Sequence, residues 1–195
     1  VDQVITNSTF FKNVLMDNGI KTPISIVPNA VDVTKYNRSV DKYPLSGLRS
    51  FNFLSMFHFG DRKAPEVLLR AFAEEFRDSD DVTLTIHSLS MLWSLQQQNK
   101  TLQEYVLEVT GGVTHAPIFI TSNYIRDEIV PHFMKNFDVN VLASRAEGFG
   151  NSIIESASLG IPSIVTGYSG VLDFITDETG WKVDYKLVDI PLQIL

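Results

Sequence analysis

Short apolar runs alternate with amphipathic segments along most of this 195-residue sequence, and this alternation constrains the fold more than any other feature. The apolar runs predict β-strands at residues 4–6, 25–27, 51–57, 82–86, 118–120, 137–143, 163–166 and 181–183. Apolar strands that alternate with helices indicate a parallel sheet covered on both faces. We therefore predict an α/β fold.

The helix predictions depend on capping residues and on apolar spacing. Asn7 or Ser8 is expected to cap a first helix, and Gly19 suits its C-terminus. Pro65 is a favourable first residue for a second helix, which would bury Leu68, Leu69, Phe72 and Phe76. Further helices are expected at residues 93–109, 131–136 and 152–159, with a helical turn at 171–175.

Composition excludes several classes of protein. The 16 basic and 23 acidic residues give a net charge of −7, which argues against non-specific nucleic-acid binding. Without cysteine there is no disulfide scaffold or cysteine nucleophile, and the four histidines lack metal-ligand spacing, so no metal site is predicted. The sequence contains no run of 18 apolar residues, so no membrane span is predicted. The start at Val1 and the apolar end at 191–195 predict a fragment of a larger protein.

Residues 143–155 carry the strongest signal for a ligand site, because ligands of parallel sheets bind at the carboxyl ends of strands. Gly148 and Gly150 allow close approach of the backbone, and the amides at the start of the next helix can bind an anion. Glu147 and Glu155 lie eight positions apart. From the local sequence alone, Glu155 is as consistent with a capping box with Ser152 as with a ligand contact. Glu147 is likewise as consistent with an exposed loop acid as with a ligand contact.

A second polar loop, residues 58–65, places Arg62 and Lys63 just before a helix, at the edge of the sheet that carries Glu147. Considered alone, such a pair is more often a solvated surface pair.

Together these segments resemble family 4 of the retaining glycosyltransferases, the glycosyl transferases group 1, which have the GT-B fold. Glu147-Gly148-Phe149-Gly150 followed by Glu155 is similar to the family's E-x7-E motif. Four other segments resemble further motifs of the family. Residues 28–32 resemble P-N-G-V-D, residues 62–72 the R-K-G helix start, residues 156–165 the E-A-M-A-x-G-x-P-V-V run, and Gly180 the G-x-L-V turn. Each motif is weak alone, but together in this order they are specific.

The resemblance implies the C-terminal half of a GT-B fold, with a Rossmann-like parallel sheet and helices on both faces. Residues 1–33 would be the tail end of the N-terminal domain and the interdomain segment, residues 34–50 a linker, and residues 51–195 the sugar-nucleotide-binding domain, truncated at its C-terminus. The acceptor-binding half would be missing, so we expect the isolated fragment to be inactive in transfer.

The resemblance also implies roles for individual residues. Lys63 and Glu147 would be catalytic: Lys63 would bind the donor diphosphate, and Glu147 the hydroxyls of the transferred sugar. Glu155 would bind the ribose, and backbone groups near Ile125 would hold the base. The other expected donor-binding residues are Arg62, Gly148, Phe149, Gly150, Asn151 and Ser152.

Three departures from the family pattern bear on this site. The family often ends its first strand with Gly-Arg, whereas this chain has Met56-Phe57-His58, so Arg62 or His58 would replace the missing arginine. His87 replaces a glycine after the second strand of the domain. The twin glycines expected near residue 170 are reduced to Ser169-Gly170.

The implied activity is transfer of a sugar from a UDP-, GDP- or ADP-sugar to an unknown glycan, lipid or protein acceptor, with retention of anomeric configuration. No cofactor, metal or nucleic acid is required. We expect a cytoplasmic protein, peripheral at a membrane in its full-length form. A non-catalytic nucleotide-sugar-binding GT-B module and a GT-B nucleotide-sugar epimerase are the alternatives.

Overall fold

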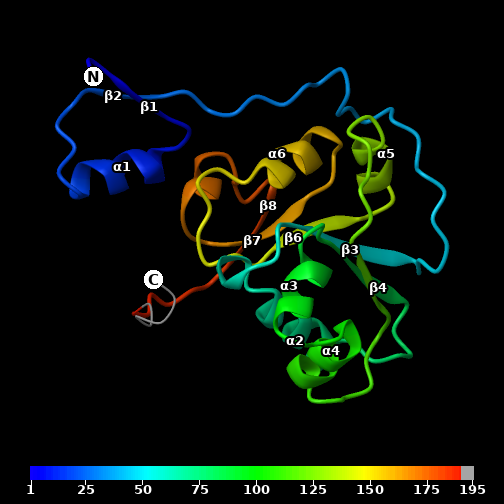
Figure 1. Ribbon diagram of the computed structural model, residues 1–195. Helices are drawn as coiled ribbons and strands as arrows, with labels where there is room; N and C mark the ends of the chain where they lie inside the picture. The colour runs from blue at the N-terminus through cyan, green and yellow to red at the C-terminus, as the bar shows by residue number, and fades with distance from the viewer. Residues whose placement is uncertain (190–195) are drawn as a thin grey trace.

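The computed structural model describes residues 1–189 and contains two parallel β-sheets of unequal size (Figure 1). The apolar end predicted at residues 191–195, and with it the last part of the predicted domain 51–195, lies outside the described residues.

The smaller sheet pairs β1 (Val4–Thr6) with β2 (Ile24–Ile26), and α1 (Thr9–Asp17) connects them. Ser8 is the N-cap of α1, because its hydroxyl accepts a hydrogen bond from the amide of Phe11 at 3.2 Å. Gly19, just after the helix, has a φ of +86°. The capping prediction is therefore confirmed for Ser8, and Asn7 is free to line the cleft described below.

The larger sheet has six parallel strands in the order β5-β4-β3-β6-β7-β8. The strands are β3 (Phe51–Met56), β4 (Val82–His87), β5 (Ile118–Thr121), β6 (Val139–Leu142), β7 (Ser163–Thr166) and β8 (Gly180–Val183). The chain moves outward from β3 to β5 and then returns to pair β6 with β3. That reversal makes a topological switch point, where ligands of such sheets bind.

Helices cover both faces of this sheet, as predicted (Figure 1). On one face, α2 (Pro65–Glu75) and α4 (Leu102–Thr110) pack against strand residues such as Leu84 and Ile86. On the other, α5 (Val130–Met134) and α6 (Asn151–Ser158) cover a cluster that contains Leu54 and Leu159. The central strands are buried on both sides, which explains their continuous apolar character.

The prediction of a single helix at residues 93–109 is wrong, because the segment forms two helices, α3 (Met91–Gln97) and α4. Asn99 interrupts it with a left-handed φ of +51°, and Thr101 then starts α4 with a capping box to Glu104. The ends of the other predicted helices and strands differ from the observed ones by no more than two residues.

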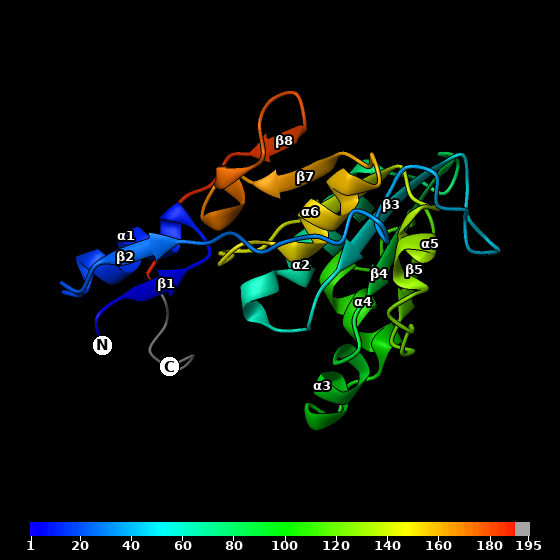
Figure 2. The ribbon, with the colours of Figure 1, turned by 90° about the horizontal axis from the view of Figure 1, so that it is seen from above.

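The described segment 27–50 has no helix or strand, and it crosses the face of the sheet that carries α5 and α6 (Figure 2). The side chain of Tyr36 is buried there in the cluster with Leu159. The smaller sheet and α1 also contact loops of the larger sheet. The amide of Thr9 donates to Asp173 at 2.7 Å, and the ring of Phe10 meets that of Tyr168 edge-on.

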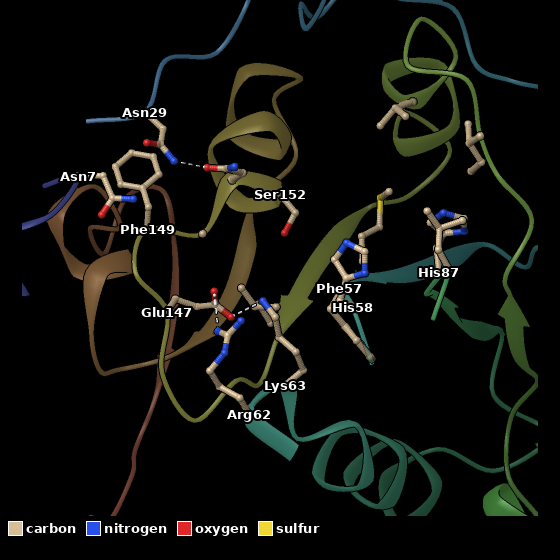
Figure 3. A pocket seen from close by; sticks show the side chains of 17 residues that line it. Asn7, Asn29, Phe57, His58, Arg62, Lys63, His87, Glu147, Phe149 and Ser152 are labelled. Carbon is tan, nitrogen blue, oxygen red and sulfur yellow. Dashed lines mark hydrogen bonds and ion pairs between the residues drawn. The ribbon is translucent and has the colours of Figure 1, made fainter. Parts of the chain in front are cut away.

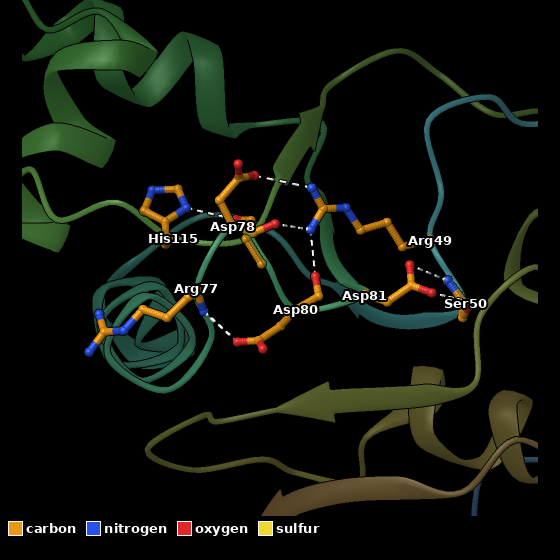
Figure 4. A network of polar contacts seen from close by, with 8 residues as sticks. Arg49, Ser50, Arg77, Asp78, Asp80, Asp81 and His115 are labelled. Carbon is orange, nitrogen blue, oxygen red and sulfur yellow. Dashed lines mark hydrogen bonds and ion pairs between the residues drawn. The ribbon is translucent and has the colours of Figure 1, made fainter.

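The amino ends of β3 and β4 are tied together by a polar network (Figure 4). The guanidinium of Arg49 donates to the carbonyls of Asp78 and Asp80, and the Ser50 hydroxyl hydrogen-bonds the Asp81 carboxylate. This network fixes the edge of the sheet opposite the switch-point loops.

Within residues 1–189, none of the helices has the length and apolar character needed to cross a membrane.

Candidate functional site

A cleft of about 510 Å³ opens at the carboxyl ends of the central strands (Figure 3). Its walls come from the loops after β3, β4, β5 and β6, from the start of α6, and from two asparagines of the N-terminal part of the chain. The polar or charged side chains that line it are Asn7, Asn29, His58, Arg62, Lys63, His87, Glu147, Asn151 and Ser152. It therefore lies at the edge of the sheet where the sequence predicted a site.

Arg62, Lys63 and Glu147 meet inside this cleft (Figure 3). The ammonium of Lys63 lies 2.5 Å from one carboxylate oxygen of Glu147, and the guanidinium of Arg62 lies 3.1 Å from the other. The side chains of Glu147 and Lys63 are only 7% and 14% exposed, so solvent screens their charges weakly. Two cations and one anion leave a net positive charge, which favours an anionic ligand.

Backbone contacts hold the two charged loops against each other. Lys63 ends a short 3-10 turn, Asp61–Lys63, and Ala64 then takes a left-handed φ of +47° before α2 begins. The Arg62 guanidinium donates to the carbonyl of Ala146 at 2.7 Å, and the Arg62 carbonyl accepts from the amide of Arg145 at 2.8 Å. Residues far apart in sequence thus form one rigid corner of the cleft.

A third loop supports Glu147 from behind. The Glu147 amide donates to the hydroxyl of Ser169 at 2.8 Å, and the Glu147 carbonyl accepts from the amide of Gly170 at 2.9 Å. A Cβ atom on Gly170 would lie 2.1 Å from the carbonyl oxygen of Gly148. Glycine is therefore required at residue 170 for the two loops to pack this closely.

The start of α6 faces the cleft with Gly150 as its N-cap, at a φ of +97°, and no side chain in the described part of the chain caps the helix. The amides of such a first turn can bind an anion. The Asn151 side chain accepts a hydrogen bond from Asn29 at 2.7 Å. Because Gly150 is the N-cap, Glu155 lies in the second turn of the helix, which excludes its capping box with Ser152.

Glu155 is not among the residues that line the cleft. Burial raises the pKa of its carboxyl group, and the nearby charge of Asp127 adds to the rise. Lys35 and a hydrogen bond from Tyr36 oppose it. The structure thus places this carboxylate beside the segment 27–50, in surroundings where ionisation is costly.

The far end of the cleft is more apolar and includes Ile125 and Val130. His87 enters it from the end of β4 (Figure 3), and its Nδ1 lies 2.8 Å from the Thr121 hydroxyl. Burial lowers the pKa of His87, so the imidazole is neutral at pH 7. A neutral ring held by one nitrogen leaves the other free to hydrogen-bond a ligand.

Most of the predicted site residues thus share one cleft: Ile125, Arg62, Lys63, Glu147, Phe149, Gly150, Asn151 and Ser152. Gly148 and Glu155 are not among the residues that line it. The sequence did not predict Asn7 or Asn29 as lining residues, and the signal for Ser169 was only a missing glycine. Among the described residues, no three His, Asp or Glu side chains gather as a metal site.

The sequence profile of a family described as "Glycosyl transferases group 1" matches residues 49–189. A capsular polysaccharide biosynthesis glycosyltransferase, CapM of Staphylococcus aureus, is 34% identical over 51% of this chain and 26% of its own length. An alpha-monoglucosyldiacylglycerol synthase of Streptococcus pneumoniae is 25% identical over 100% of this chain and 44% of its own length. The chain therefore spans less than half of these curated relatives.

Solved structures show the same fold. A sucrose-phosphate synthase of Thermosynechococcus elongatus has a TM-score of 0.72 at 20% identity, over 94% of this chain and 45% of its own. The Anabaena protein HepE, solved in complex with UDP-glucose, has a TM-score of 0.70 at 18% identity, over 94% of this chain and 50% of its own.

Proposed function

Because the chain belongs to the group 1 glycosyltransferases, we propose that it is the donor-binding part of a retaining glycosyltransferase and binds a nucleoside diphosphate sugar in its cleft. The observation that carries the proposal is the convergence of Arg62 and Lys63 on Glu147 beside the uncapped start of α6. In this proposal, residues 51–195 form the donor domain, residues 34–50 the linker, and residues 1–33 the end of the acceptor domain.

The cations and the helix start would act on the diphosphate. As the bond between sugar and phosphate breaks, the leaving diphosphate gains negative charge. Lys63 is nearly buried, and the first amides of α6 are fixed by the helix, so neither needs much rearrangement to meet that charge. Such preorganised groups contribute roughly 2–4 kcal/mol each to transition-state stabilisation. Arg62, or His58 across the cleft, would take the second phosphate contact.

The carboxylates would act on the neutral parts of the donor. Glu147 would accept hydrogen bonds from hydroxyls of the transferred sugar, since its oxygens lie inside the cleft with the two cations. The family resemblance assigns the ribose to Glu155. Its carboxyl group lies beside Tyr36 and outside the cleft in this structure, so this contact requires the side chain to turn toward the cleft with its carboxylate ionised. The base would lie at the apolar end near Ile125.

The first test is binding of UDP, GDP and ADP to this chain, measured by calorimetry and thermal shift. A ligand at one hundred times its dissociation constant should stabilise the folded chain by about 2.7 kcal/mol. We expect Lys63→Ala to weaken binding of the preferred diphosphate by at least tenfold and to change binding of the matching nucleoside far less, because only the diphosphate is charged there.

Lys42→Ala is the matched control, because Lys42 is exposed and does not line the cleft. If none of the three nucleotides binds at millimolar concentration, the donor site is refuted. Equal losses for diphosphate and nucleoside would assign Lys63 to folding instead. Product analysis with a labelled nucleotide sugar, in a protein that carries both halves, would distinguish transfer from epimerisation.

A further inference from the structure

Ser169 has a backbone conformation that serine rarely adopts. Its φ is +77° and its ψ is −157°, a region that is open to glycine and strained for residues with a Cβ atom. The residue is 4% exposed and stands at the start of a short 3-10 turn, η2 (Gly170–Asp173). A side chain at this position needs a compensating role, because glycine would avoid the strain.

The Ser169 hydroxyl supplies that compensation at the candidate active site. It accepts the hydrogen bond from the Glu147 amide at 2.8 Å, and this bond is buried. Glycine at residue 169 would leave the Glu147 amide without this partner. The strained backbone is therefore coupled to one specific contact, made to the residue whose carboxylate binds both cations of the cleft.

The loop that carries Ser169 is itself anchored on its far side. The ring of Tyr168 packs edge-on against Phe10, with centroids 5.2 Å apart, and Asp173 accepts from the Thr9 amide at 2.7 Å. These contacts attach the loop to α1, so it forms a fixed support behind Glu147.

We propose that Ser169 is a positioning residue, which sets the direction of the Glu147 side chain for recognition of the donor sugar. Its hydroxyl fixes the amide side of Glu147 while the Gly170 amide fixes the carbonyl side, so the peptide units on both sides of this residue are held. The inference rests on the proposed function, because it assigns the consequence to the sugar part of the donor. Diphosphate binding depends on Lys63 and the start of α6, which Ser169 does not touch.

The test compares Ser169→Ala, which keeps the strained Cβ and removes the hydroxyl, with Ser169→Gly, which removes both. Ser163→Ala is the matched control, because Ser163 is a buried serine whose hydroxyl has no hydrogen-bond partner within residues 1–189. Each variant is assayed for hydrogen exchange at the Glu147 amide and for dissociation constants of UDP and UDP-glucose. GDP and GDP-glucose replace this pair if the chain prefers guanine, and ADP and ADP-glucose replace it if the chain prefers adenine.

We expect both Ser169 variants to speed exchange at the Glu147 amide and to weaken UDP-glucose binding by roughly tenfold, the value of one net hydrogen bond. UDP binding should be unchanged, as should all values for Ser163→Ala. Ser169→Gly should melt no lower than Ser169→Ala because it relieves strain. An equal loss of sugar recognition in the two variants would therefore follow the missing hydroxyl, which they share, and not their stability.

Unchanged exchange at Glu147, or equal losses for UDP and UDP-glucose, would overturn the role of Ser169. Failure of the unmodified chain to bind any of the nucleotides would refute the proposed function instead. The exchange measurement needs no ligand, so it would still decide whether Ser169 holds Glu147.

Discussion

The carboxyl group of Glu155 lies where ionisation is unfavourable, because burial and the charge of Asp127 raise its pKa above the ordinary value of 4.5. The folded chain therefore holds this proton more tightly than the unfolded chain does. Stability from this group is complete below pH 4.5 and is lost as the pH rises through the raised pKa. In the proposed ribose contact the ionised form accepts the stronger hydrogen bonds, so stability and the proposed binding favour opposite protonation states of this residue.

We predict that Glu155→Gln raises the melting temperature at pH 8 and has little effect at pH 4, because glutamine removes the cost of ionisation. The same variant should weaken nucleotide binding by roughly 1–3 kcal/mol through loss of a charge-assisted hydrogen bond. Thermal melts at the two pH values and calorimetry with the preferred nucleotide check both parts. Glu128→Gln is the control, since Glu128 is an exposed acid outside the cleft. A pH-independent effect of Glu155→Gln would contradict the prediction.

Residue identities predicted the charged part of the site better than the part that supports it. The meeting of Arg62, Lys63 and Glu147 was predictable because their loops follow neighbouring strands of a parallel sheet and because the family resemblance selected these residues; side-chain chemistry alone did not. Ser169 was not predictable, because its role depends on a backbone conformation and on an amide 22 residues away. Asn29 was missed for a similar reason, since its partner Asn151 lies 122 residues along the chain.

At the scale of elements, the packing of the loops after β6 and β7 holds Glu147 in place. Substitution of Gly170, with Gly60 as its control, tests the importance of this packing. Gly170→Ala would force the loop after β7 away from the loop after β6, because the new Cβ would meet the Gly148 carbonyl at 2.1 Å. We expect the free energy of unfolding to fall by about 1–3 kcal/mol, a typical cost of overpacking, and binding of the nucleotide sugar to weaken as Glu147 moves.

Gly60→Ala is the matched control in the loop after β3. A Cβ atom added to Gly60 would meet no heavy atom within 4 Å, and the φ of 162° at this residue is extended. Chemical denaturation of the two variants gives the comparison. Equal stability of Gly170→Ala and the unmodified chain would show that the two loops can separate without cost.

Helix and strand positions were largely predictable, because periodicity records which faces are buried. The division of the helix expected at 93–109 was not predicted. Its two parts continue a similar apolar pattern, and the break depends on a left-handed Asn99 and on the capping box at Thr101. The spacing of Thr101 and Glu104 was visible in the sequence, but no apolar pattern distinguished it from a helix interior.

Residues 1–189 form a six-stranded sheet with helices on both faces and a two-stranded parallel sheet. The exposed side chains of Ile5 and Ile26 lie on that smaller sheet, whereas the strands of the large one are mostly buried. Contacts between the two parts include the hydrogen bond from Thr9 to Asp173 and the edge-on packing of Phe10 against Tyr168. The cleft is therefore formed mainly by the loops of the large sheet.

We predict that this chain binds a nucleotide sugar without transferring it, and hydrolyses it at most slowly. Transfer needs an acceptor hydroxyl held against the anomeric carbon, and such positioning supplies roughly 7–11 kcal/mol. Supplying a complete N-terminal half should restore transfer with retention, which NMR of the labelled product would show. Robust transfer by residues 1–195 alone, abolished by Glu147→Ala, would contradict this and reveal an acceptor site within the chain.

The ion pair between Lys63 and Glu147 joins residues 84 positions apart, across the central strands β3 and β6. Such a contact cannot form until the long intervening stretch has folded back on itself, and closing a long loop costs entropy before the contact repays it. Local helices and the neighbouring pair of β3 and β4 can form earlier. During folding, the proposed anion site therefore forms late, so ligand binding would report completion of the sheet and not its first steps.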